Sequence, residues 1–195
     1  MATITSFVPS KEYVTRSKKE ISKAIAELDS SRDDKKFKDF KPLRDLVLDF
    51  AKRNNIIVYG GSAVNHYLPE GEKIYDENDI TDVDMMSPDS ECFAKKLADE
   101  LDDTGVKYVE SRESKVHDKT FSIKGMEIGI LADISLVKKE TIRSLRSIQT
   151  DKPYAPIEYL FYSMHCEFSV NREPRRWEKI HERFITADTT NRAGQ

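Results

Sequence analysis

A short apolar run that ends at two adjacent glycines constrains the fold more than any other feature of this sequence. Residues 56–59 (IIVY) are β-branched and aromatic, which favours a buried strand, and Gly60, Gly61 and Ser62 follow directly. Only seven glycines occur in the chain, so two in succession mark a place where the backbone turns sharply or approaches another group closely. The pattern predicts a strand that turns into a helix, with Ser62 as the N-cap of that helix.

Two carboxylates follow in the next predicted strand. Residues 80–86 (ITDVDMM) are typical of a strand, and Asp82 and Asp84 lie two residues apart within it. Side chains alternate between the two faces of a strand, so both carboxylates project the same way while Val83 and Met85 face the core. Burying two adjacent carboxylates is costly unless a cation lies between them, and oxygen ligands favour Mg²⁺ or Mn²⁺. For this short motif alone, two solvated aspartates on a surface strand remain the alternative.

A third carboxylate interrupts a later apolar strand. In residues 126–137 (MEIGILADISLV) the even-numbered positions form an almost continuous apolar face, whereas Asp133 lies on the odd-numbered face. If the two strands are neighbours, Asp133 joins Asp82 and Asp84 and completes a site for two divalent ions. Glu127 shares the parity of Asp133 but lies about 20 Å away along a strand. Two more acidic candidates, Asp76 and Asp79, lie between the two motifs.

The Gly-Gly-Ser turn carries the groups that a triphosphate requires. Without side chains, Gly60 and Gly61 let backbone N–H groups approach a phosphate, and the start of the helix favours negative charge. The hydroxyl of Ser62 can donate a hydrogen bond to the same phosphate. An ordinary strand-to-helix turn is the alternative for this motif alone. The complete order, with a strand, this turn, a helix, the paired aspartates and the later Asp133, is far more specific.

The remaining pattern predicts an α+β protein with a mixed sheet of four to five strands and helices at both ends. Ser87 and Pro88 suit the N-cap and first turn of a helix that ends near Gly105. Further strands are expected at 107–110, 119–123 and 126–137, the last two joined by a hairpin turn at Lys124 and Gly125. Apolar residues at helical spacing predict flanking helices within 10–28, 43–50, 157–168 and 174–184.

The last of these predicted helices is basic. Arg176, Lys179 and Arg183 lie on or near it and are candidates for contacts with RNA phosphates. A solvated helix face, anchored in the core by Trp177, is the alternative.

Composition excludes several classes of protein. The 32 basic and 35 acidic residues nearly cancel, so the chain is not a polycation that coats nucleic acid. Cys92 and Cys166 belong to no CxxC motif or Cys/His cluster, which predicts buried free thiols rather than disulfides or a zinc site. No signal peptide and no apolar run of membrane-spanning length is present, so we expect a soluble protein of the cytoplasm with no membrane partner.

The order of these motifs resembles the DNA polymerase β-type nucleotidyltransferase superfamily, whose signature is GG[ST], then [DE]x[DE], then a later acidic residue. That resemblance covers about residues 55–137. The segment between Ser62 and Asp82 is longer than is usual there. Together with HDKTFSI, LADIS and RRWEKIHERF, it looks like the catalytic subunit of poly(A) polymerases from large DNA viruses of the poxvirus and giant-virus type. This narrower match extends to about residue 183.

The resemblance implies a nucleotidyltransferase palm at 55–150, an N-terminal helical segment at 1–54 and a C-terminal helical extension at 151–195. Asp82 and Asp84 would bind two Mg²⁺ or Mn²⁺ ions, and Asp133 would bind the ion that activates a 3′-hydroxyl. The phosphates of ATP would lie against the turn formed by Gly60, Gly61 and Ser62.

The implied activity is template-independent addition of AMP from ATP to an RNA 3′ end, in the host cytoplasm or a viral factory. One alternative is nucleotidyl transfer to another acceptor, such as tRNA, a small molecule or a protein. Another is a non-catalytic palm that only binds nucleotide, although the intact carboxylates argue against it. Members of that family continue into a large C-terminal domain. We therefore expect either that this sequence is a fragment or that a homodimer or partner subunit supplies the grip on RNA.

Overall fold

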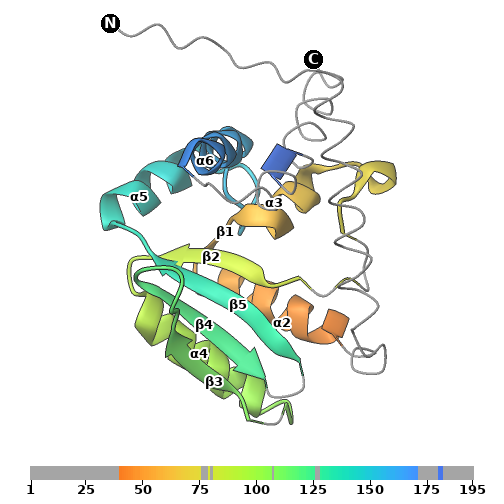
Figure 1. The fold of residues 1–195 in the computed structure, drawn as a ribbon, viewed down its shortest axis with the longest axis vertical. Coiled ribbons are helices and arrows are strands. Elements are labelled where there is room, and N and C mark those ends of the chain that lie inside the picture. Colours follow the sequence, from red (N-terminus) through yellow and green to blue (C-terminus); the bar gives the residue numbers. More distant parts are fainter. Residues whose placement is uncertain are drawn as a thin grey trace, which may run out of the picture. The chain divides into compact units, whose positions relative to one another are not determined.

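A mixed five-stranded sheet lies at the centre of the structure, a computed structural model that describes residues 40–75, 79, 81–106, 108–125, 128–170 and 180–181. The strands are arranged in the order β1-β2-β5-β4-β3 (Figure 1). Their bounds are β1 Ile57–Val58, β2 Val83–Ser87, β3 Glu110–Glu113, β4 Thr120–Gly125 and β5 Gly129–Leu136. β2 and β5 run parallel, whereas the other neighbouring pairs are antiparallel. The predicted mixed sheet of four to five strands is confirmed.

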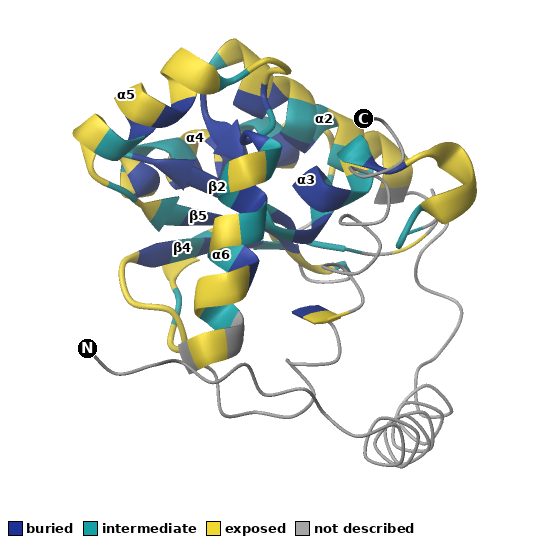
Figure 2. Cartoon of the chain, turned by 90° about the horizontal axis from the view of Figure 1, so that it is seen from above, coloured by how far each residue is buried: buried dark blue, intermediate teal, exposed yellow. Residues whose placement is uncertain are grey.

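Helices pack against the sheet, whose central strands are largely buried. Their bounds are α2 Phe40–Arg53, α3 Gly60–Tyr67, α4 Ser90–Asp102, α5 Lys139–Ile148 and α6 Ile157–Val170, with a 3₁₀ turn η1 at Glu70–Glu72. Helices α2 and α4 contact each other and lie behind the sheet, whereas α3 contacts β2 and α6 (Figure 1). The buried residues concentrate in the central strands and on the inward sides of the helices (Figure 2).

The helices predicted within 43–50 and 157–168 are confirmed as α2 and α6. Helix α5 was not predicted, because only Ile142 and Leu145 of its residues are buried and its short stripe is surrounded by polar residues. The segment 10–28 lies outside the described residues, as does most of 174–184. Among the described helices, none is long and apolar enough to cross a bilayer. The domain boundaries at 54/55 and 150/151 stay a prediction.

The start of α4 differs from the prediction. The helix begins at Ser90 with Asp89 as its N-cap, rather than at Ser87 and Pro88. Ser87 is instead the last residue of β2, opposite Leu136, and its carbonyl accepts a hydrogen bond from the backbone N–H of Val137 at 2.9 Å. Pairing with β5 therefore holds Ser87 in the sheet, and the helix starts after the turn that follows.

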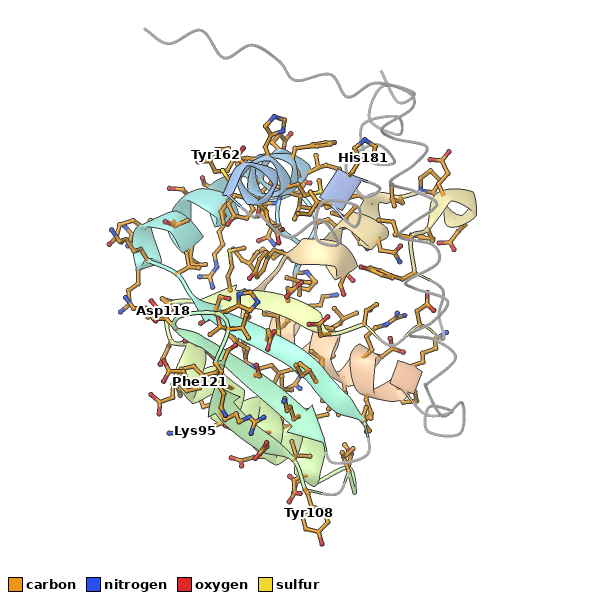
Figure 3. The ribbon with its side chains drawn as sticks, viewed as in Figure 1. Lys95, Tyr108, Asp118, Phe121, Tyr162 and His181 are labelled. Carbon is orange, nitrogen blue, oxygen red and sulfur yellow. The ribbon has the colours of Figure 1, made fainter. Side chains whose placement is uncertain are left out.

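The outer strand also differs from the prediction, because β3 covers Glu110–Glu113 rather than 107–110. Tyr108 has a positive φ of 55°, is 73% exposed and points away from the sheet at its outer edge (Figure 3). Glu110 pairs with Lys124, and Glu113 pairs with Phe121. The strand is thus defined by hydrogen bonding to β4 and not by apolar side chains, which is common at a sheet edge.

The predicted hairpin is confirmed, but its turn lies beyond Gly125, because Lys124 and Gly125 belong to β4. A bulge shifts the register of β4 and β5, so Ile123 pairs with Ala132 while Lys124 pairs with Ile130. The even-numbered face is therefore not continuous. Ile130 and Leu136 are 38% and 46% exposed, whereas Leu131, at the bulge, is buried.

Both cysteines are free thiols, as predicted. Their predicted burial is wrong at Cys166, which is exposed on α6, four residues from the exposed Tyr162 (Figure 3). Cys92 is partly buried on α4. Residues four apart share one side of a helix, so Cys166 lies on the outward side with Tyr162.

Candidate active site

Three aspartates converge at the centre of the sheet. Asp84 of β2 pairs directly with Asp133 of β5, and the two strands are parallel neighbours, so both carboxylates project from the same face. Asp82 lies just before β2 and turns its carboxylate toward the same place. One carboxylate oxygen from each of the three lies within 4.8 Å of the others. Like charges this close repel strongly unless a cation or a proton intervenes.

Asp82 is held differently from its partners, which corrects the strand predicted over 80–86. β2 begins only at Val83, so Asp82 has no place in the hydrogen-bond ladder of the sheet. Its carbonyl oxygen instead accepts a hydrogen bond from the hydroxyl of Ser62 on α3 at 3.3 Å. The position of Asp82 therefore depends on α3 as well as on the strand that follows it.

Gly60 lies directly against the carboxylate of Asp84. Its φ is +65°, and a Cβ added there would lie 2.1 Å from Asp84 Oδ2, far inside van der Waals contact. The backbone N–H of Tyr59, the preceding residue, donates to the carbonyl of Asp84 at 2.9 Å. Glycine is thus required at position 60 both for its backbone conformation and for the close approach of Asp84 on β2.

The environment of Asp133 fits a metal ligand. Its Oδ1 is buried and has no hydrogen-bond partner among the described residues. Burial raises the pKa of Asp133 and the charge of Asp82 adds to the rise, whereas a hydrogen bond from the Ser122 hydroxyl lowers it. A buried, unpaired carboxylate oxygen beside two further carboxylates is unfavourable without a cation. The all-oxygen donor set suits a hard divalent ion, so the residues present fit the implied metal.

The N-terminus of α3 lies next to this cluster. Helix α3 begins at Gly60 with Tyr59 as its N-cap, and no side chain caps it. The prediction that Ser62 caps the helix is therefore wrong, because Ser62 is the third residue of the helix. Its hydroxyl and the backbone N–H groups of the first turn lie at the same end of α3, where the helix dipole favours an anion such as a phosphate.

A chain of hydroxyl groups beside the carboxylates was not predicted from the sequence. The hydroxyl of Tyr59 lies 3.1 Å from that of Ser135, and the Ser135 hydroxyl lies 3.0 Å from that of Thr120. Burial raises the pKa of Tyr59 to about 12, and the charge of Asp84 acts in the same direction, so Tyr59 stays protonated. The sequence could have predicted the position of Ser135, because it lies two residues after Asp133 and alternate residues of a strand share one face.

The remaining predicted residues fall away from this cluster or cannot be placed. Asp79 is exposed and is not among the described carboxylates that cluster for a metal. Glu127 and Asp76, the two further acidic candidates for the third ligand, lie outside the described residues. The three candidates for RNA contacts, Arg176, Lys179 and Arg183, also lie outside them.

Comparison with solved structures identifies the fold. A crystal structure of the Megavirus polyadenylate synthase matches with a TM-score of 0.71 at 20% sequence identity, covering 98% of this chain and 40% of that one. This chain therefore shares the α+β fold of that polyadenylate synthase, a mixed sheet with flanking helices, and the predicted fold class is confirmed.

The sequence comparison assigns this chain to a more specific group of proteins than the fold does. Residues 45–170, more than half of the chain, match the family of the poly(A) polymerase catalytic subunit, and this chain belongs to that family. A predicted catalytic subunit from Acanthamoeba polyphaga mimivirus is 25% identical over 153 residues, which cover 74% of this chain and 25% of that protein. One from African swine fever virus (isolate Pig/Kenya/KEN-50/1950) is 29% identical over 149 residues, covering 72% and 30%. The chain therefore spans roughly a quarter to a third of the length of these relatives.

Proposed function

We propose that this chain carries the catalytic centre of a template-independent nucleotidyltransferase that adds AMP from ATP to an RNA 3′ end. The observation that carries the proposal is the convergence of Asp82, Asp84 and Asp133 within 4.8 Å beside the uncapped start of α3. Membership of the poly(A) polymerase catalytic subunit family supports ATP and RNA as the substrates. The proposed site for a triphosphate would thus adjoin the proposed site for divalent ions.

The three carboxylates would divide their roles between two Mg²⁺ or Mn²⁺ ions. Asp82 and Asp84 would hold both ions, and Asp133, from the adjacent strand, would hold only the ion on the acceptor side. Bound ions would supply charge neutralisation for the triphosphate and a lowered pKa for the attacking hydroxyl. The protein contributes the fixed positions of the ligands, which the pairing of β2 with β5 and the contact of Gly60 with Asp84 maintain.

The first turn of α3 would bind the phosphates. Without side chains, Gly60 and Gly61 would let an anion approach the backbone N–H groups, and the Ser62 hydroxyl could exchange its bond to the Asp82 carbonyl for one to a phosphate oxygen. Binding of the triphosphate would in this way be coupled to the position of Asp82.

Divalent ions should stabilise the folded protein measurably. At a metal concentration about 100-fold above the dissociation constant, linkage raises the free energy of unfolding by about 2.7 kcal/mol. In Asp82→Asn or Asp84→Asn this increment should disappear, while stability without metal stays level or rises because carboxylate repulsion is relieved. Thermal melts with and without Mg²⁺ or Mn²⁺ measure both effects. Asp99→Asn, at an exposed position on α4, should behave like wild type. Loss of stability without metal in the active-site variants would instead indicate structural aspartates.

Extension of a labelled oligoribonucleotide tests the activity. With ATP and Mg²⁺ or Mn²⁺, we expect a ladder of products that lengthen without a template, and much weaker extension with the other three nucleotides. Asp84→Asn is the matched inactive control. Absence of extension with any RNA, despite metal and ATP binding, would favour another acceptor such as tRNA, a small molecule or a protein. Absence of nucleotide binding as well would reject the proposed function.

Several parts of the proposal concern regions beyond the described residues. Arg176, Lys179 and Arg183 are proposed to contact the RNA backbone, and a homodimer or partner subunit is proposed to strengthen the grip on RNA. The viral relatives favour action in the host cytoplasm or a viral factory.

A further inference from the structure

One side of α3 binds the long segment that connects this helix to the catalytic strand. The side-chain amide of Asn65 makes three hydrogen bonds to that segment. Its Oδ1 accepts from the backbone N–H groups of Ile74 at 2.7 Å and Tyr75 at 3.0 Å, and its Nδ2 donates to the carbonyl of Tyr75 at 3.2 Å. A single side chain thus satisfies both polar groups of the Tyr75 backbone.

Ser62 makes the second attachment. It lies three residues before Asn65, so the two side chains are neighbours on the helix surface. The Ser62 hydroxyl donates to the carbonyl of Asp82, at the other end of the segment that leads from Tyr75 back to the catalytic strand. The chain from Tyr75 to Asp82 is therefore attached to the same side of α3 at its beginning and at its end.

These two attachments matter because Asp82 is the one carboxylate of the cluster that the sheet does not hold. Asp84 and Asp133 are fixed by strand pairing, whereas Asp82 precedes β2. When a phosphate takes the Ser62 hydroxyl, the amide of Asn65 still holds the start of this segment against α3.

We propose that Asn65 is a positioning residue that orients the carboxylate of Asp82 by fixing the start of this segment against α3. The proposal rests on the proposed function, in which Asp82 is a metal ligand. The chemistry is specific to asparagine, since the position requires one acceptor for two N–H groups and one donor for a carbonyl. Aspartate supplies the acceptor but turns a second oxygen toward the Tyr75 carbonyl, and alanine supplies neither.

Binding of Mn²⁺ in the absence of nucleotide separates this role from phosphate binding, because Ser62 then keeps its bond to the Asp82 carbonyl in wild type and variants alike. We expect Asn65→Ala to weaken Mn²⁺ binding by about 10-fold, the lower end of the effect of removing a residue hydrogen-bonded directly to a metal ligand, because Asn65 acts on Asp82 through the connecting chain. Asn65→Asp should give an intermediate affinity. The free Mn²⁺ concentration is followed by electron paramagnetic resonance, with thermal melts to verify folding. In extension assays the variants should require more Mn²⁺ for half-maximal rate, while KM for RNA stays unchanged.

Asn54→Ala is the matched control, because Asn54 also donates its side-chain amide to a carbonyl, that of Phe50 in α2, and is not part of the cluster. It should bind Mn²⁺ like wild type. Unchanged Mn²⁺ affinity in folded Asn65→Ala would overturn the proposal, as would equal weakening in Asn54→Ala. If Asn65→Ala does not fold, the Mn²⁺ affinity of Asn65→Asp tests the proposal instead. An affinity equal to that of wild type in this variant would overturn it. If wild type and Asp82→Ala bind Mn²⁺ equally, the proposed metal site fails instead, which is a distinct result.

Discussion

Replacing Asp133 by alanine is expected to reduce turnover by roughly 10³-fold or more while the affinity for metal-bound ATP changes little. The scale is that of removing a group that acts mainly in the transition state. Asp133 comes from β5, whereas Asp82 and Asp84 come from β2 and the residue before it. If only Asp133 is restricted to the ion on the acceptor side, its loss leaves the triphosphate held and the attacking hydroxyl unactivated.

Single-turnover extension and nucleotide affinity by calorimetry, measured on the same preparations, separate these two effects. Asp84→Ala is the comparison, and it should lose both activity and affinity. Asp133→Asn keeps the shape of the side chain and should be equally inactive. Burial raises the pKa of Asp133, so its ionised form costs stability above the pKa of the unfolded chain. In the absence of metal at neutral pH, Asp133→Asn should therefore be as stable as wild type or more stable. Normal turnover in Asp133→Ala would mean that another acid, such as Glu127 or Asp76, is the third ligand.

Gly60→Ala should also disable the site, although it adds a single methyl group. The new Cβ would lie 2.1 Å from Asp84 Oδ2, so the carboxylate must move by more than 1 Å or the turn must open. A displacement of that size at a reacting centre lowers the rate by about 10²-fold. The substitution also places alanine at a positive φ of 65°, which costs about 1–2 kcal/mol of stability.

Two other glycines provide matched controls for this substitution. Gly105 has a φ of +87° with open space around its Cα, so Gly105→Ala should lose stability through strain and keep full activity. Gly71 has neither a positive φ nor a neighbour within 4 Å, so Gly71→Ala should change neither property. Chemical denaturation and the extension assay measure the two properties for all three variants. Activity of Gly60→Ala equal to that of Gly105→Ala would show that strain alone matters and that the contact with Asp84 does not.

Much of the architecture followed from local patterns in the sequence. The apolar run before Gly60 and the segment around Asp84 correctly predicted strands, and the amphipathic stripes correctly predicted α2, α4 and α6. The spacing of Asp82, Asp84 and Asp133 also indicated which side chains share a face. These inferences succeed because side-chain periodicity is a local property, which burial on one face imposes on each strand or helix separately.

The boundaries of the elements required the sheet itself. Serine is a common N-cap residue, but pairing with Leu136 holds Ser87 in β2. β3 has few apolar residues and exists because β4 offers an unpaired edge. Hydrogen bonds between strands join residues far apart in the chain, and local propensity does not contain that information.

The sequence by itself determined which carboxylates and glycines are present, in which order, and on which faces of their strands. Only the tertiary structure decided that β2 and β5 are parallel neighbours in a register that sets Asp84 opposite Asp133. It also decided that Gly60 touches Asp84 and that Asp82, outside the sheet, is held by α3 through Ser62. The physical reason is that a site of this kind is made of distances between separate elements, and packing and strand register fix those distances only when the whole core forms.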